Sequence, residues 1–129
     1  MTTVLLVEDQ LELRAIHGTY LAEHGYRVLT ASDGDAALRV TRAEMPDVIV
    51  MDHSLPHRTG VEVAQALRDD VATASIPVIM MTAHAYGAVG KKARAAGCVA
   101  FLAKPCNPSR VMEEIVRFTG ERTGSGTLT

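Results

Sequence analysis

The sequence has little of what marks several large classes of protein. Its 129 residues include no Trp, and aromatic residues make up 4% of the chain, which argues against an aromatic surface that stacks on nucleic-acid bases. The two cysteines, Cys98 and Cys106, do not form a CxxC pair and are too few for a disulfide scaffold. A formal net charge of −2 gives no reason to expect nucleic acid or an anionic membrane surface as a partner.

No segment predicts export or membrane insertion. The chain begins Met1-Thr2-Thr3, and a short apolar run follows that ends in two acids, so the basic flank and long apolar region of a signal peptide are absent. No apolar stretch approaches the roughly 18 residues of a membrane-spanning helix. We therefore expect a cytoplasmic location and no membrane partner. The length is typical of one domain with a single core.

Five short apolar runs predict five strands. Three of them, the first, third and fourth, are continuous rather than alternating, which is typical of strands buried on both faces of a parallel sheet. The starts of successive runs lie 22, 22, 30 and 21 residues apart, which leaves room for one helix between each pair. The runs are Val4–Val7, Tyr26–Leu29, Val48–Met51, Val78–Met81 and Val99–Leu102.

The segments between these runs predict helices, and the fold class is therefore α/β. The predicted helices cover Leu13–Leu21, with Gly25 as a stop, and then Asp35–Ala43, Val61–Arg68, Lys91–Ala96 before Gly97, and a last helix capped by Asn107 or Ser109. Because Gly87 and Gly90 weaken the fourth helix, we expect it to begin late, nearer Gly90 than Tyr86. Residues 1–120 form the predicted domain, and the polar residues 121–129 form a predicted disordered tail.

Chemistry-bearing residues follow four of the five runs. Ligands of open α/β sheets bind outside the carboxyl ends of the strands, so these residues are expected to converge. The first run is followed by Glu8 and Asp9, the third by Asp52, the fourth by Thr82 and the fifth by Lys104. Taken singly, each has a simpler interpretation: the acids as helix caps or turn formers, the Thr as strand chemistry and the Lys as a solvated charge. Their conjunction at one sheet edge favours a functional site.

Three carboxylates close together repel one another unless a cation is present. One Mg²⁺ and one Lys supply three positive charges against three negative ones. Mg²⁺ prefers a few carboxylate oxygens together with water and substrate phosphate, so such a site favours a phosphoryl group. An Asp can then act as the nucleophile and form an acyl phosphate, and the hydroxyl of Thr82 can donate a hydrogen bond to a phosphoryl oxygen.

From Thr3 to about Thr119, the chain resembles the receiver domains of two-component response regulators, single-domain chemotaxis regulators among them. The stretches that carry the resemblance are Val4 to Asp9, Asp47 to Asp52, Pro56 followed by Gly60, Pro77 to Ala83, and Phe101 to Pro105. The resemblance implies a doubly wound, flavodoxin-like (βα)₅ fold with a five-stranded parallel sheet of order 2-1-3-4-5. It implies that Asp52 accepts a phosphoryl group from a phosphorylated His of a sensor kinase or phosphotransfer protein.

The resemblance also implies individual roles. Asp9, Asp52 and the backbone carbonyl of Ser54 hold Mg²⁺, and Glu8 acts through water. Lys104 pairs with Asp52 and afterwards with the phosphoryl group, in a loop where relatives typically have a cis Lys–Pro peptide. Thr82 moves to bind a phosphoryl oxygen and Phe101 turns inward.

The resemblance further implies that two positions tune the lifetime of the acyl phosphate. Ser54 lies two residues after Asp52, and His84 lies two residues after Thr82. We hypothesise that His84 influences the attacking water; the alternative is a solvent-exposed loop residue. Neither the histidines nor the cysteines form a zinc pattern, and both thiols are expected to be free.

Several functions compete on these residues. The first is a phosphorylation-switched module that takes up and slowly loses a phosphoryl group at Asp52 and acts through contacts with a downstream protein, as a monomer or weak dimer. The alternative is a small Mg²⁺-dependent phosphatase with an Asp nucleophile, but Ser54 stands where such enzymes have a second Asp. A flavodoxin-like cofactor binder lacks a phosphate-cradling loop, and a receiver that is never phosphorylated would not need the complete set of residues. Since a receiver takes up about 119 residues, we expect no DNA-binding or catalytic output domain in this chain: it is a stand-alone regulator or a part of a larger protein.

Overall fold

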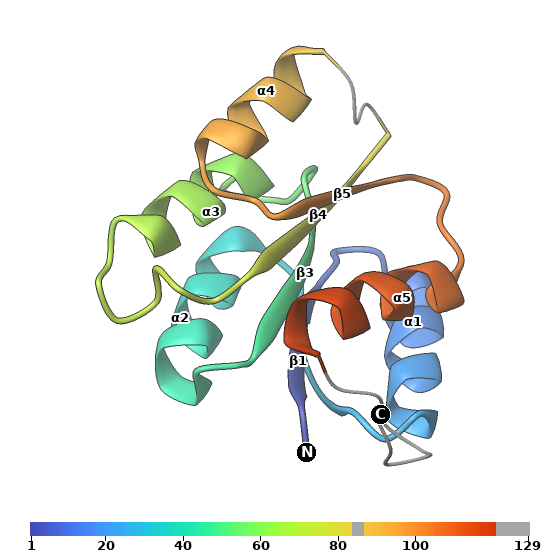
Figure 1. Ribbon diagram of the computed structural model, residues 1–129. Coiled ribbons are helices and arrows are strands. Elements are labelled where there is room, and N and C mark those ends of the chain that lie inside the picture. The colour runs from blue at the N-terminus through green and yellow to red at the C-terminus, as the bar shows by residue number, and fades with distance from the viewer. Residues whose placement is uncertain (84–86, 121–129) are drawn as a thin grey trace.

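A computed structural model describes residues 1–83 and 87–120, in which five strands alternate with five helices (Figure 1). The strands are β1 (Thr3–Val7), β2 (Arg27–Ala31), β3 (Val48–Asp52), β4 (Val78–Thr82) and β5 (Ala100–Ala103). The helices are α1 (Leu11–Glu23), α2 (Gly34–Glu44), α3 (Gly60–Arg68), α4 (Ala88–Ala95) and α5 (Pro108–Thr119).

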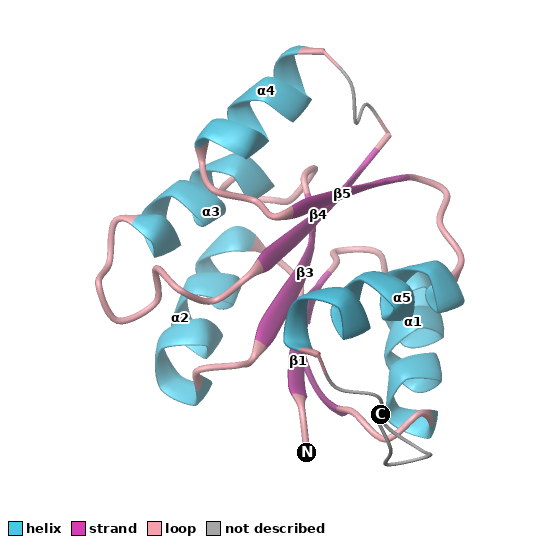
Figure 2. Ribbon diagram, in the orientation of Figure 1, coloured by secondary structure: helices cyan, strands magenta, loops and turns pink. Residues whose placement is uncertain are grey.

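The strands form one parallel sheet in the order β2-β1-β3-β4-β5, as predicted. Helices α1 and α5 cover one face of the sheet, while α2 and α3 cover the other, and α4 lies beside α3 (Figure 2). This is the three-layer, doubly wound arrangement, in which the carboxyl ends of the parallel strands lie along the same edge of the sheet.

The centre of the sheet is apolar on both faces. Every residue of β3 and β4 is buried, and so is every residue of β1 after Thr3. Neighbouring residues of a strand point to opposite faces, so Leu5 belongs to the core beneath α2 and α3, and Leu6 belongs to the core beneath α1 and α5. The continuous apolar runs of the sequence therefore have the cause that was predicted, burial on both sides.

The two edge strands begin later than the sequence pattern predicts. The predicted strand Tyr26–Leu29 is Arg27–Ala31, and the predicted strand Val99–Leu102 is Ala100–Ala103. Each edge strand pairs on one side only, and β2 starts where Arg27 pairs with Thr3 of β1. Tyr26 is buried but lies before this paired row, so hydrophobicity alone placed the strand one residue too early.

Helix α4 begins at Ala88, midway between Tyr86 and Gly90, so the prediction of a start nearer Gly90 was wrong. Gly87 precedes the helix with a φ of 91°, a conformation that favours glycine and supplies the turn into it. In α5, Asn107 takes the N-cap position without a side-chain hydrogen bond, and Pro108 follows. The predicted tail, 121–129, lies outside the described residues, and within them no helix is long and apolar enough to cross a membrane.

Candidate functional site at the carboxyl edge of the sheet

The acidic residues predicted to converge lie together at the carboxyl edge of the sheet. Glu8 and Asp9 follow β1, and Asp52 is the last residue of β3, the strand beside it. One carboxylate oxygen from each of the three lies within 4.8 Å of the others. Glu8 is fully buried and Asp52 is 4% exposed, while Asp9 is exposed. The parallel register of β1 and β3, in which Val7 pairs with Met51, creates this cluster.

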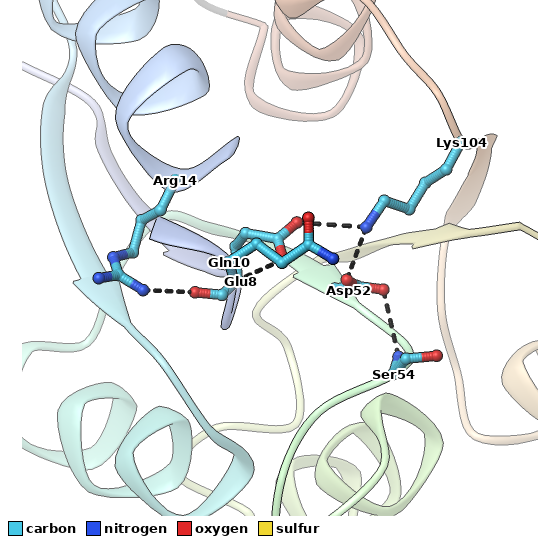
Figure 3. Close-up of polar contacts among 6 residues, drawn as sticks. All are labelled: Glu8, Gln10, Arg14, Asp52, Ser54 and Lys104. Carbon is cyan, nitrogen blue, oxygen red and sulfur yellow. Dashed lines mark hydrogen bonds and ion pairs between the residues drawn. The ribbon is translucent and has the colours of Figure 1, made fainter. Parts of the chain in front are cut away.

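Lys104 connects the two buried carboxylates. It follows β5, and its Nζ lies 2.7 Å from Oδ2 of Asp52 and 3.3 Å from Oε1 of Glu8 (Figure 3). The peptide bond from Lys104 to Pro105 is cis, as expected from the resemblance. The strand ends thus bring together three negative charges and one positive charge.

The pKa shifts of these groups reflect crowding of charge away from water. Burial raises the pKa of Glu8, and the nearby charge of Asp52 raises it further, against the opposing effects of a backbone hydrogen bond and Lys104. Burial by itself disfavours the charged form of Lys104, but its hydrogen bond to Asp52 and the charges of both acids outweigh this and raise its pKa. Lys104 therefore stays an ammonium group, and the cluster keeps an excess of negative charge.

The second oxygen of Asp52 is held by the loop that follows β3. Its Oδ1 accepts a hydrogen bond of 3.1 Å from the backbone N–H of Ser54. The N–H of Gly60 at the start of α3 donates to the carbonyl of His53 at 2.8 Å, which fixes the far end of the loop. A Cβ on Gly60 would lie 2.9 Å from the carbonyl oxygen of Asp52, so only glycine fits there without a shift. Both oxygens of Asp52 are therefore oriented, one by Lys104 and one by Ser54.

The other predicted residues lie around this cluster. Thr82 ends β4 and is buried, one row beyond Met81, the residue that pairs with Asp52. The ring of Phe101 on β5 is partly buried, and the guanidinium carbon of Arg94 lies over it, 4.8 Å from the ring centre. His84 lies outside the described residues. Both cysteines are free; burial raises the pKa of Cys98 to about 12, so it stays a thiol.

Sequence reasoning missed two arginines near the site. Arg14, on the first turns of α1, donates from Nη1 to the backbone carbonyl of Glu8 at 2.8 Å. Arg94 packs on Phe101, as described above. A cation near the N-terminus of a helix opposes the helix dipole, so the position of Arg14 was a weak signal of a compensating contact. The sequence contains no comparable signal for Arg94.

Comparisons with known proteins agree with this arrangement. The profile of the response regulator receiver domain matches residues 4–116. The chain belongs to this family. It is 34% identical over 119 residues to the polar-differentiation response regulator DivK of Brucella anthropi, across 92% of this chain and 97% of the relative. The DivK of Brucella ovis matches to the same extent.

Solved receiver structures superpose on almost the whole chain. The chemotaxis response regulator CheY4 of Vibrio cholerae has a TM-score of 0.86 and 31% identity, covering 92% of this chain and 98% of that one. The receiver domain of the sensor histidine kinase PA1611 of Pseudomonas aeruginosa has a TM-score of 0.85 and 29% identity, covering 93% of this chain and 98% of that one. In that structure a magnesium ion is coordinated in the active-site cleft.

The chain is therefore a receiver domain, a module of phosphorylation-switched signalling. Phosphorylation of an Asp and binding of Mg²⁺ in an acidic cleft are general features of this family, and Glu8, Asp9 and Asp52 form an acidic cluster in this chain. The alternative of a small Mg²⁺-dependent phosphatase receives no support from these matches.

Proposed function

We propose that Asp52 is the phosphoacceptor of this receiver and that a phosphorylated histidine on a sensor kinase or phosphotransfer protein is the donor. The observation that carries the proposal is that both carboxylate oxygens of Asp52 accept hydrogen bonds. Oδ2 accepts one from Nζ of Lys104 at 2.7 Å, and Oδ1 accepts one from the backbone N–H of Ser54 at 3.1 Å. Asp52 is one of two buried acids in the cleft, and it is the one that ends a central strand, at the middle of the carboxyl edge.

The charges of the cleft fit a divalent cation. Three carboxylates face one ammonium group, which leaves two negative charges uncompensated. We assign Asp9, Asp52 and the carbonyl of Ser54 as the groups that hold Mg²⁺, with Glu8 acting through water. Glu8 is fully buried, and its carboxylate accepts hydrogen bonds from Lys104 and from the backbone N–H of Gln10. These bonds support contact with Mg²⁺ through water rather than directly. When bound, the ion neutralises charge on the phosphoryl group and on the acids.

The phosphoryl transfer follows from the geometry around Asp52. A carboxylate oxygen of Asp52 forms the new bond to phosphorus, and the bond from the donor's imidazole nitrogen breaks, with the nitrogen keeping the electron pair. Lys104 is a positive charge within reach of the oxygens that gain charge. The phosphoryl group is lost slowly by hydrolysis. A water molecule attacks the same phosphorus, the carboxylate of Asp52 leaves, and inorganic phosphate is released.

The switch that reports phosphorylation lies at β4 and β5. We propose that the hydroxyl of Thr82 turns toward the phosphoryl oxygens and that Phe101 moves further inward. Both start from suitable places, since Thr82 is buried at the end of β4 and Phe101 is partly buried on β5. Arg94 on α4 would lose its contact with the ring, which links the site to that helix. Ser54 and His84 are proposed to tune the lifetime of the acyl phosphate.

The partners of this module are proposed to be proteins. The nucleophile is 4% exposed, so a donor histidine must enter the cleft from its rim. Leu11, the first residue of α1 after the acidic loop, is 69% exposed and offers an apolar contact for the donor. The relatives named DivK and CheY4 are response regulators. By analogy, we propose that this chain acts on a downstream protein target.

The test is uptake of one phosphoryl group. Incubation with acetyl phosphate and Mg²⁺, followed by intact-mass measurement, should give a single adduct that disappears in Asp52→Asn and in the absence of Mg²⁺. The matched control is Glu23→Gln, an exposed acid that ends α1, at the opposite end of this helix from the loop that carries Asp9. An adduct that persists in Asp52→Asn would refute the assignment. The same assay with a phosphorylated histidine phosphotransfer protein in place of acetyl phosphate tests the class of donor.

A further inference from the structure

Arg14 contacts the acidic loop from the side opposite Lys104. The loop is Glu8, Asp9 and Gln10, which connects β1 to α1. Figure 3 shows the guanidinium group of Arg14 reaching the carbonyl of Glu8, while Lys104 approaches the side chain of Glu8 from across the cleft. The distance from Nη1 to the carbonyl oxygen is 2.8 Å, a good hydrogen bond from a charged donor.

The hydrogen bond from Arg14 satisfies a backbone carbonyl that has no partner in the sheet. The pairing of β1 with β2 ends at the row of Val7 and Ala31, although the N–H of Glu8 still donates to the carbonyl of Ala31 at 3.0 Å. The carbonyl of Glu8 lies beyond the last paired row, and Arg14 provides its donor. Because Glu8 is fully buried, an unpaired carbonyl there would be costly.

The peptide that Arg14 holds is the one that leads into Asp9. A trans peptide is planar, so fixing the direction of the Glu8 carbonyl also fixes the N–H and Cα of Asp9. Within residues 1–83 and 87–120, the Asp9 side chain makes no hydrogen bond or ion pair, so its position depends on its backbone. Glu8 differs, because its carboxylate is bonded to Lys104 and to the N–H of Gln10.

We propose that Arg14 is a positioning residue for Mg²⁺: it fixes the Glu8–Asp9 peptide so that the exposed carboxylate of Asp9 faces the other two acids before the ion arrives. The inference rests on the proposed function, in which Asp9 is a metal ligand. A role in helix stability does not account for the residue, because a cation in the first turns of α1 opposes the helix dipole. A role as a counter-ion does not either, since its bond goes to a carbonyl.

The experiment is a calorimetric titration of the unphosphorylated protein with MgCl₂ at constant ionic strength. Arg14→Met should weaken Mg²⁺ binding about tenfold, the lower end of the range for residues that orient metal ligands. Arg14→Lys can still donate to the carbonyl and should recover most of the affinity. The control is Arg39→Met, which removes the same charge from an exposed position on α2. Should Arg14→Met fail to fold, Arg14→Ala carries the same test, because it also removes the donor.

A second readout separates positioning from stability. With acetyl phosphate as donor, Arg14→Met should need about ten times more Mg²⁺ for half-maximal phosphorylation, while the rate at saturating Mg²⁺ stays within about twofold of the wild type, because the lost affinity is restored by excess ion. If the variant is less stable but binds Mg²⁺ as the wild type does, the inference is wrong and the proposed function stands. If the wild type itself neither binds Mg²⁺ nor takes up a phosphoryl group, the proposed function fails.

Discussion

The helices on the two faces of the sheet begin in different ways. On one face, Asp33 caps α2 and Thr59 caps α3 with side-chain hydrogen bonds, and Thr59 forms a full capping box with Glu62; α4, beside α3, begins after Gly87 without a side-chain cap. On the other face, neither α1 nor α5 has a side-chain cap. A cap contributes about 1 kcal/mol to helix stability, so the starts of α2 and α3 are defined locally, whereas α1 and α5 depend on packing.

The space around the glycines of α2 and α3 is also tighter than the space around Gly18 of α1. A Cβ on Gly60 of α3 would lie 2.7 Å from Sδ of Met80, and one on Gly34 of α2 would lie 2.6 Å from Cβ of Arg58. A Cβ on Gly18 of α1 would meet its nearest neighbour, Leu6, at an ordinary 3.8 Å. The loop after Asp52 is thus enclosed by the tight starts of α2 and α3, while α1 has room to spare. We infer that the starts of α2 and α3 hold the loop after Asp52 in place, whereas α1 packs less tightly around Gly18.

The strongest test of this contrast is Gly60→Ala. The added methyl group must displace Met80 or the backbone of Asp52 and His53, so we expect a loss of about 1–3 kcal/mol in the free energy of unfolding. The shifted loop should also slow phosphorylation by acetyl phosphate. Urea denaturation measures the first effect and intact mass the second. An unchanged urea midpoint would show that the α3 start is looser than its contacts indicate.

The same substitution on the opposite face should have the opposite sign. Gly18→Ala lies in the interior of α1 and meets only ordinary contacts, from Leu6 at 3.8 Å and Val28 at 3.9 Å. Alanine is favoured over glycine in a helix by about 1 kcal/mol, so the variant should be more stable by up to that amount. Urea denaturation beside Gly60→Ala provides the matched pair. A destabilised Gly18→Ala would mean that the two faces are packed equally tightly.

The sequence predicted the structure best where a sequence pattern has only one physical cause. The central strands were predicted to within one residue at each end, because burial on both faces leaves continuous apolar runs such as Val48–Met51. Glu8, Asp52 and Lys104 could be placed together because parallel strands end at one edge. The edge strand β2 was shifted, since Tyr26 is as buried as a strand residue but lies outside the ladder.

The features that sequence reasoning missed depend on three-dimensional contacts with backbone or rings. Arg14 bonds to a carbonyl, and every residue type has one, so no partner residue marks the contact. Arg94 packs on Phe101 from another element, at a separation that no helix or strand period predicts. The tight fit around Gly60 depends on Met80, which lies 20 positions along the chain, on β4. Position 60 was recognised only through the family resemblance.

The smallest expected effect concerns a buried histidine on the face that lacks caps. His17 of α1 is 4% exposed, and within the described part of the chain its Nδ1 has no hydrogen-bond partner. Burial lowers the pKa of His17 below its usual 6.5, and the positive charge of Lys104 lowers it further. The folded protein therefore holds this ring neutral at a pH where the unfolded chain binds a proton.

The sign of the pH dependence follows. Above about pH 6.5 neither state protonates the ring and stability does not depend on it; as pH falls below that value, the unfolded state takes up the proton first and stability is lost. Between pH 7.5 and 5.5 the wild type should lose up to about 1 kcal/mol that His17→Leu retains. Urea denaturation across this range measures it, with His57→Asn as control, since His57 is exposed and its φ of 71° suits Asn. Parallel curves for wild type and His17→Leu would show that the α1–α5 face tolerates a charge in its core, and that its looseness extends to the interior.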